Sequence, residues 1–283
     1  MIKSKLLMLL VAGLLLAGIA AAQDAPDDDA VWSAFTGWFR TAPQERDLFG
    51  MYSAKLGAEG VPEAEIRRRL AVIVKLFAER PEGAEIFYDR AYSRPLTGDP
   101  SLDSPRAPSA FVVEAAKGLK PGTALDLGTG QGRNAVHLAA QGWDVTGLDI
   151  SQAGLDEAQA NAAKAGVRIR TVKGTYEAYD PGVDRWDLIV VVFAWAPVED
   201  ASFLARLKTS LKPGGVVLFE HFVTDSEHPH APMVRALKPD GLKTLFADFE
   251  LVSYEEKEMT ADWGGPGLPG RAHGRPEEVL RAQ

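Results

Sequence analysis

One stretch in the middle of the chain, residues 123–134, places the tightest limits on its fold. It reads Thr-Ala-Leu-Asp-Leu-Gly-Thr-Gly-Gln-Gly-Arg-Asn, and its first part, residues 124–127, predicts a short buried strand. Glycines then alternate at positions 128, 130 and 132, and residues 133–141 predict a helix that ends at Gly142. A strand, a glycine turn and a helix bring backbone N–H groups at the helix N-terminus within reach of a ligand. We therefore expect a ligand-binding turn here, with glycine required because a Cβ atom would hold the ligand away.

A glycine turn of this kind has other possible uses. It can serve packing alone, and dinucleotide-dependent enzymes contain a similar one. In this chain the spacing is Gly-x-Gly-x-Gly rather than Gly-x-Gly-x-x-Gly, and Asp126 stands two residues before the first glycine. A carboxylate there would repel a pyrophosphate but attract a ligand that carries an ammonium or sulfonium group. Asp126 thus favours a cationic ligand over NAD.

Predicted strands and helices alternate after the glycine turn. Strands are expected at residues 143–148, 167–172, 186–193, 216–219 and 249–254, with a last short one at 278–282. Helices are expected after the N-cap Ser151 and over residues 201–211 and 242–246. This alternation predicts an α/β fold, a Rossmann-like, doubly wound and mostly parallel sheet with helices on both faces.

Three motifs together resemble a known family. The glycine turn resembles motif I of the class I S-adenosylmethionine-dependent methyltransferases, and the run Gly-Gln-Gly-Arg-Asn is similar to their tellurite-resistance-type branch. The turn 211–215, Leu-Lys-Pro-Gly-Gly, and the strand opening at 186–190, Trp-Asp-Leu-Ile-Val, resemble two further signatures in the family's order. The resemblance covers roughly residues 110–254. It implies a seven-stranded sheet with an antiparallel last strand, S-adenosylmethionine as cofactor, and methyl transfer as the reaction.

The resemblance also implies where the cofactor binds. Asp126 would balance its positive charge, the glycines would admit its amino-acid end, and Asp149, which ends the second strand, would hold the ribose. The same carboxylate serves NAD enzymes or can cap a helix, so Asp149 supports adenosine without choosing the cofactor. The residues expected at the cofactor are Asp126, Gly128, Thr129, Gly130, Gly132, Arg133, Asn134, Asp149, Ile150, Thr175, Tyr176 and Phe193.

One position departs from the family. After the third strand the family usually has an acid that accepts a hydrogen bond from the adenine amino group. This chain has Gly174-Thr175-Tyr176, so we expect a weaker contact through the Thr175 hydroxyl.

Candidates for the remaining chemistry lie at the carboxyl ends of the later strands. Glu220 and His221 follow the fifth strand and are candidate general bases, and Trp195 is a candidate wall of the acceptor pocket. Tyr88 and Tyr92 are candidate lid residues. An ordinary structural role is the alternative for each of them. The pair His228 and His230 lacks further ligands, so we expect a solvated loop and no metal site.

The N-terminus has the layout of a secretory signal peptide. Lys3 and Lys5 precede an apolar run from Leu6 to Ala22, where three alanines offer a cleavage site. We expect export to the periplasm or the outside, with no membrane span after cleavage, or a membrane anchor if the segment is retained. Residues 1–22 are thus predicted as signal peptide, 23–108 as a helical cap and linker, and 109–283 as the methyltransferase domain.

Charge limits the partners. The net charge of −8, from 31 basic and 39 acidic residues, argues against a broad nucleic-acid-binding face. A small-molecule acceptor is expected, and the oligomeric state is open. Two other functions are considered: an exported module that binds a nucleoside or S-adenosylmethionine without catalysis, and a NAD-dependent oxidoreductase.

Overall fold

The computed structural model describes residues 26–43, 47–94, 106–221, 223, 237–259 and 272–281. It divides into two compact units, Met1–Phe77 and Ala78–Gln283. The predicted signal peptide lies outside the described residues, as do His228 and His230. Within the described ranges, no helix is long and apolar enough to cross a membrane.

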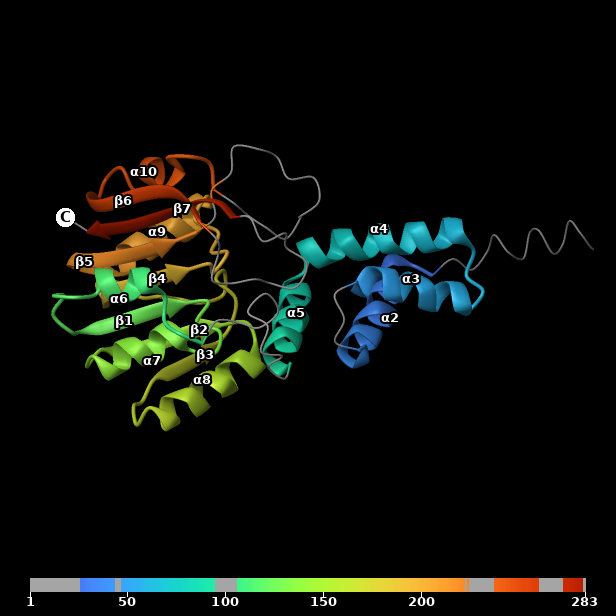
Figure 1. The fold of residues 1–283 in the computed structure, drawn as a ribbon. Helices are drawn as coiled ribbons and strands as arrows, with labels where there is room; N and C mark the ends of the chain where they lie inside the picture. The colour runs from blue at the N-terminus through green and yellow to red at the C-terminus, as the bar shows by residue number, and fades with distance from the viewer. Residues whose placement is uncertain are drawn as a thin grey trace, which may run out of the picture. The chain divides into compact units, whose positions relative to one another are not determined.

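The first unit is helical, as its apolar spacing predicts. It contains α2 (Asp28–Thr41), α3 (Leu48–Ala58) and most of α4 (Glu63–Glu79) (Figure 1). The Asp27 side chain caps α2 by accepting a hydrogen bond from the backbone N–H of Ala30. Phe35 is fully buried, and its ring meets that of Tyr52 edge to face with 5.1 Å between centroids. Aromatic packing between α2 and α3 therefore holds this unit together.

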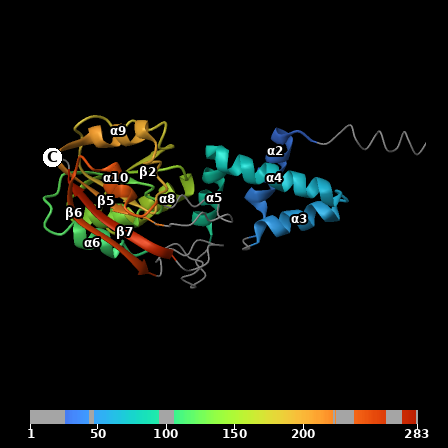
Figure 2. The same cartoon turned by 90° about the horizontal axis from the view of Figure 1, so that it is seen from above.

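The second unit alternates strands and helices around one sheet (Figures 1 and 2). Its elements are α5 (Pro81–Ser93), α6 (Ala110–Ala115), β1 (Thr123–Leu127), α7 (Arg133–Ala140), β2 (Asp144–Asp149), α8 (Gln152–Lys164), β3 (Arg170–Lys173), β4 (Trp186–Val192), α9 (Ala201–Ser210), β5 (Leu211–Glu220), α10 (Gly241–Leu245), β6 (Glu250–Met259) and β7 (Ala272–Arg281). The strand order is β3-β2-β1-β4-β5-β7-β6. The first five strands are parallel, and β7 pairs antiparallel with both β5 and β6. The predicted Rossmann-like, mostly parallel sheet is confirmed.

The two faces of the sheet bury separate cores. Along β1, the side chains of Leu125 and Leu127 join a core with Phe203 of α9 and Leu242 of α10, whereas Ala124 faces the opposite side. That second core contains residues of α6, α7 and α8. Because strand side chains alternate between faces, helices on both sides are needed to cover this apolar sheet.

Two boundaries differ from the predictions. The third strand begins at residue 170 rather than 167, because the N–H of Val167 still bonds to the carbonyl of Ala162 at the end of α8. The turn at 212–215 lies inside β5, as an irregularity between the pairs Trp186–Leu211 and Leu188–Val216. Within the second unit, α5 packs against α8.

A charged cluster joins the amino ends of three strands. The Asp187 carboxylate of β4 accepts hydrogen bonds from Lys212 Nζ of β5 and from the backbone N–H of Thr123 of β1, both at 2.7 Å. Burial opposes ionisation of Asp187, but these hydrogen bonds outweigh it and lower its pKa. Two of the family signatures seen in the sequence thus meet in one contact that fixes the sheet.

Candidate functional site

The candidate site lies where the strand order reverses. The chain proceeds from β1 outward to β2 and β3, then returns to the other side of β1 as β4 and β5. Ligands of open α/β sheets bind at the carboxyl ends of the strands at such a point. The glycine turn follows β1 there, and Asp149 ends the neighbouring β2.

The glycine turn is tied to β2 through its backbone. The N–H groups of Gly128 and Thr129 both donate to the carbonyl oxygen of Leu148, at 2.8 and 3.0 Å. Gly128 and Gly130 have positive φ angles of 68° and 51°, a region that disfavours other residues. These two glycines therefore let the main chain turn tightly at the carboxyl edge of the sheet, where Gly128 is half-buried and Gly130 is buried.

The third glycine has a different role. A Cβ atom on Gly132, whose φ is 79°, would lie 2.8 Å from the Cβ of Ala158 in α8. Gly132 therefore permits α7 and α8 to pack closely. Helix packing accounts for this glycine, and a contact of Gly132 with a cofactor stays a prediction.

Asp149 is held on both sides by backbone donors. Its Oδ2 accepts from the N–H of Gly130 at 2.7 Å, and its Oδ1 accepts from the N–H of Ser151 at 2.8 Å. Asp149 is 7% exposed, and burial raises its pKa while these N–H groups and that of Ile150 oppose the rise. A carboxylate offers about four acceptor positions, so with three backbone donors one position remains for a ligand hydroxyl.

Asp126 is a buried acid beneath the turn. It is 2% exposed, and the Thr129 hydroxyl donates to its Oδ2 at 2.7 Å. Burial raises the pKa of Asp126 to about 7, with the hydrogen bond from Thr129 opposing the rise. An acid in such surroundings is stabilised in its charged form by a nearby cation.

Tyrosines of α5 lie against the glycine turn. The Tyr92 hydroxyl occupies the place that a Cβ atom on Gly130 would take, and its ring also contacts Gly154 of α8. Tyr88 stacks on Tyr92 with 6.3 Å between ring centroids. Burial raises the pKa of both phenols, and the charge of Asp149 adds to the rise. Tyr92 thus lies against the glycine turn and Tyr88 packs beside it, while their role as a lid stays a prediction.

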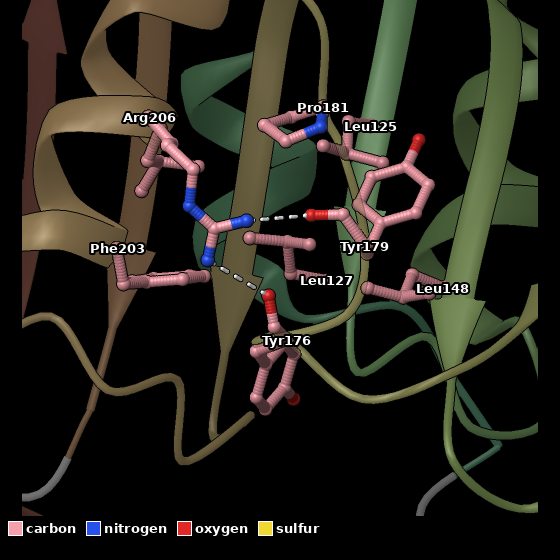
Figure 3. Close-up of a pocket in the computed structure, with 9 residues that line it drawn as sticks. Leu125, Leu127, Leu148, Tyr176, Tyr179, Pro181, Phe203 and Arg206 are labelled. Carbon is pink, nitrogen blue, oxygen red and sulfur yellow. Dashed lines mark hydrogen bonds between the residues drawn. The ribbon is translucent and has the colours of Figure 1, made fainter.

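The segment after β3 is fixed from α9. The Tyr176 hydroxyl donates to the carbonyl of Ala194, and Arg206 donates to the carbonyl of Tyr179 at 3.0 Å and of Tyr176 at 3.5 Å. Figure 3 shows both arginine contacts at the rim of an apolar hollow that Leu125, Leu127 and Leu148 also line. The Thr175 hydroxyl accepts the N–H of Ala178 at 3.2 Å. Thr175 thus closes a local turn and keeps a second lone pair for a ligand.

The end of β4 is strained. Phe193 and Trp195 have φ angles of 51° and 52°, uncommon for residues with side chains. The Trp195 ring meets the His221 ring edge to face at 4.9 Å, and a hydrogen bond joins Trp195 to Tyr88. Such strain persists where the surroundings enforce it and is concentrated at functional sites.

The two candidate bases are both buried. Glu220 is 0% exposed, and its Oε2 accepts from the Ser109 hydroxyl at 2.6 Å. The Ser109 N–H in turn donates to Asn134 Oδ1 at 2.9 Å, so Asn134 is engaged inside the protein. The His221 ring, 1% exposed, lies between those of Trp195 and Phe219. Glu220 therefore faces α6 and α7, whereas His221 borders the aromatic side of the site.

Two further predicted residues lie at the margin. Arg133 Nη1 donates to the carbonyl of Ala107 at 3.2 Å, which ties the segment before α6 to the turn. Ile150 is half-buried and directly follows Asp149. Among the residues that the structure describes, no group of His, Cys, Asp and Glu could hold a metal ion.

Comparisons with known proteins bear directly on this geometry. Residues 124–215 match the family described as "Methyltransferase domain". The chain is 30% identical over 150 residues to the probable S-adenosyl-L-methionine-dependent methyltransferase TehB of Haemophilus influenzae, covering 51% of this chain and 52% of that protein. The crystal structure of TehB from Haemophilus influenzae superposes with a TM-score of 0.51 at 25% identity, covering 61% of each chain.

Residues 124–215 are thus similar to the domains of class I S-adenosylmethionine-dependent methyltransferases. The predicted resemblance to the tellurite-resistance-type branch is confirmed by these matches to TehB. A second relative is the release factor glutamine methyltransferase of Neisseria gonorrhoeae, 35% identical over 143 residues, covering 47% of this chain and 51% of that protein. The chain thus spans about half the length of the curated relatives it matches.

The residues of this methyltransferase domain fit its cofactor. S-adenosylmethionine carries a positive charge, two ribose hydroxyls and an amino-acid end. The glycine turn, which has no side chains at Gly128 and Gly130, suits the amino-acid end, Asp149 suits the ribose, and Asp126 suits the charge. Contacts that the sequence did not predict surround them: Asp89 to Ser151, Ser109 to Glu220, and Arg206 to the segment after β3.

Proposed function

We propose that this chain transfers a methyl group from S-adenosylmethionine to a small-molecule acceptor. The observation that carries the proposal is the fixed carboxylate of Asp149, hydrogen-bonded to Gly130 of the glycine turn at the reversal of strand order. The match of residues 124–215 to methyltransferase domains supports the same activity.

Each residue has a simple task, because the bound cofactor supplies an already activated methyl group. Asp149 orients the ribose, and Asp126 balances the positive charge. Tyr88 and Tyr92 exclude water from the glycine turn. Alignment and exclusion of water are the main requirements, since proximity and orientation alone can supply about 7–11 kcal/mol.

We infer that the acceptor binds beside Trp195. Tyr88 is hydrogen-bonded to Trp195, and the Trp195 ring in turn meets the His221 ring. These three side chains give this side of the site an aromatic wall. Aromatic side chains of this kind commonly line small-molecule sites, which supports a small acceptor. One relative, by its name, methylates a glutamine of a release factor, so relatives of this domain differ in their acceptors.

His221 is the better placed of the two candidate bases. It borders Trp195, whereas the Glu220 carboxylate is engaged by Ser109 within the protein. A general base is required only if the acceptor must lose a proton during the transfer. We therefore assign Glu220 to holding β5 against α6, and His221 to the acceptor side.

We also propose that the chain is exported, on the basis of the signal-like residues 1–22. Export would separate the enzyme from the cytoplasm, where the cofactor is made, so a binding module without turnover is the second candidate function. The mass of the protein recovered from the periplasm or medium tests export: loss of residues 1–22 supports it, and retention in the cytoplasm with an intact N-terminus contradicts it.

Calorimetry tests the proposed function. The full-length protein should bind S-adenosylmethionine and S-adenosylhomocysteine but not NAD. Asp149→Ala should weaken binding about tenfold or more, because the ribose hydroxyls lose a charged acceptor. A folded protein that ignores S-adenosylmethionine at millimolar concentration would contradict the proposal. Formation of S-adenosylhomocysteine on addition of cell extract would favour the enzyme over the binding module.

A further inference from the structure

A hydrogen-bonded relay connects α5 to the carboxylate of Asp149. Asp89 of α5 accepts at its Oδ1 from the Ser151 hydroxyl at 2.7 Å and from the N–H of Ala153 at 3.1 Å. Ser151, which is fully buried, donates its own N–H to Asp149 Oδ1 at 2.8 Å. One serine thus contacts both the helix above the site and the acid within it.

The same helix carries the residue that covers the glycine turn. Tyr92 follows Asp89 by three residues, so the two side chains lie on one face of α5. On that face Asp89 meets the start of α8 while Tyr92 meets Gly130 and Gly154. The contact of Asp89 with Ser151 and the contact of Tyr92 with the glycine turn therefore lie on the same face of one helix.

α5 has a second tie to the sheet, which differs in kind. Glu85 pairs with Lys173 of β3 at 2.7 Å, with side chains 33% and 44% exposed. An ion pair so open to solvent is weak and screened by salt. It also touches neither Ser151 nor the glycine turn. Of these two acids of α5, Asp89 is the one bonded to Ser151, which itself contacts Asp149.

We propose that Asp89 is a positioning residue for cofactor binding: its contact with Ser151 sets both the orientation of Asp149 and the placement of Tyr92. The inference rests on the proposed function, since it assigns Asp149 to the ribose of the cofactor. Asp89 acts through Ser151 and α5 and makes no contact with the reacting groups. Its effect is on how tightly and how long the cofactor is held.

The competing explanation is that Asp89 only caps α8. Asp200 offers a matched control, because its carboxylate caps α9 by accepting from the N–H of Phe203 at 2.8 Å, on the opposite face of the sheet. If capping is the whole effect, Asp89→Ala and Asp200→Ala should both lower the melting temperature and leave ligand binding alone. Glu85→Ala controls for loosening of α5 in general.

The experiment measures S-adenosylhomocysteine affinity, its dissociation rate and the melting temperature in the full-length protein. Asp89→Ala should weaken affinity about tenfold, mostly through faster dissociation, because two hydrogen bonds that order the site are lost. Asp89→Asn should stay within about threefold of wild type, since its amide oxygen accepts the same bonds. Asp200→Ala and Glu85→Ala should bind as wild type does. Should Asp89→Ala not fold, Asp89→Glu shifts the acceptor by one methylene and should also bind more weakly than Asp89→Asn.

Three outcomes would overturn the inference. Wild-type affinity in Asp89→Ala, or in Asp89→Glu where the alanine variant does not fold, would remove Asp89 from the site. Equal weakening in Asp89→Asn and Asp89→Ala would show that charge rather than hydrogen-bond geometry matters. A wild-type protein that does not bind S-adenosylhomocysteine would overturn the proposed function first and this inference with it.

Discussion

Replacing Asp126 with asparagine should abolish a pH dependence of cofactor binding that the wild-type protein shows near neutrality. Asp126 is 2% exposed, and burial raises its pKa from 3.8 to about 7, with the Thr129 hydroxyl opposing the rise. At about pH 7, roughly half of the ligand-free molecules therefore carry a neutral Asp126. The amide side chain of the Asp126→Asn variant has no such proton to lose.

The size of this pH dependence follows from the positive charge that the cofactor brings close to Asp126. An opposite charge close to a carboxylate lowers its pKa by about 1–3 units, so binding should bring Asp126 to roughly 5. At about pH 7 the complex should then release about 0.5 proton per cofactor bound. Between about pH 6 and about pH 8 the wild-type binding constant should rise roughly tenfold, or about 1.4 kcal/mol.

Titration calorimetry in two buffers of different ionisation enthalpy gives the proton release directly. The cofactor's own α-amino group titrates at about 7.7–8.0, so the difference between wild type and Asp126→Asn is the quantity to compare. That difference isolates the carboxyl group, because the ligand is the same in both titrations.

The stability of the ligand-free wild-type protein should fall as pH rises, whereas its binding constant for the cofactor should increase. A raised pKa means that the native state keeps a proton that the unfolded state loses, so the contribution is fully present below about pH 4. It is lost as pH rises through about 7, and the loss amounts to roughly 4 kcal/mol for a shift of this size. In urea unfolding without ligand, the free energy of unfolding of Asp126→Asn should therefore rise relative to that of wild type between about pH 5 and about pH 8.

Equal proton release in the two proteins would refute this reasoning. So would parallel stability curves, because they would mean that Asp126 is already ionised in the native state. Equal proton release would mean that cofactor binding leaves the ionisation of Asp126 unchanged.

Three further predictions concern single residues. Gly130→Ala should lower both stability and cofactor affinity, because its φ of 51° is strained for alanine and its Cβ would displace Tyr92. Gly166 has a φ of 70° and open space around it, so Gly166→Ala should lower stability alone, by about 1–2 kcal/mol in urea unfolding. Glu220→Gln should keep the acceptor for Ser109 and reduce kcat less than tenfold, whereas a loss of about 10²–10⁴ would identify a general base. Asp187→Asn should lower stability by about 1 kcal/mol at neutral pH, because Lys212 loses its charged partner. Since the pKa of Asp187 is lowered, that difference should vanish as pH falls through the folded-state pKa; a constant difference down to about pH 2 would contradict the assignment.

The elements around the glycine turn could be predicted because local rules determine them. Apolar runs and glycine positions set β1 and α7 to within a residue or so, and the N-cap Ser151 marked the start of α8. The third strand was predicted three residues early, because Val167 and Ile169 look like strand residues although residue 167 still bonds to α8. Local propensity does not reveal that a residue beyond a helix is still hydrogen-bonded to the helix end.

The candidate site was predictable only where a residue's place on its own strand defines its role. Asp126 and Asp149 meet that condition, since each stands at the carboxyl end of a strand. Gly132 does not, because its reason is a contact with Ala158, and no local pattern shows which helix passes over a glycine. The Asp89 contact likewise joins residues 62 positions apart.

The Asp187–Lys212 contact has a consequence for how sequences of this kind are classified. Both residues stand where strands begin, at the end of the sheet away from the glycine turn and Asp149. Selection for a sound scaffold would preserve them even in a descendant that no longer handles a methyl donor. A sequence that is recognised by Asp187 and Lys212 alone is thereby shown to have the fold of the sheet. Evidence of catalysis must come from Asp126 and Asp149 at the carboxyl ends of the strands.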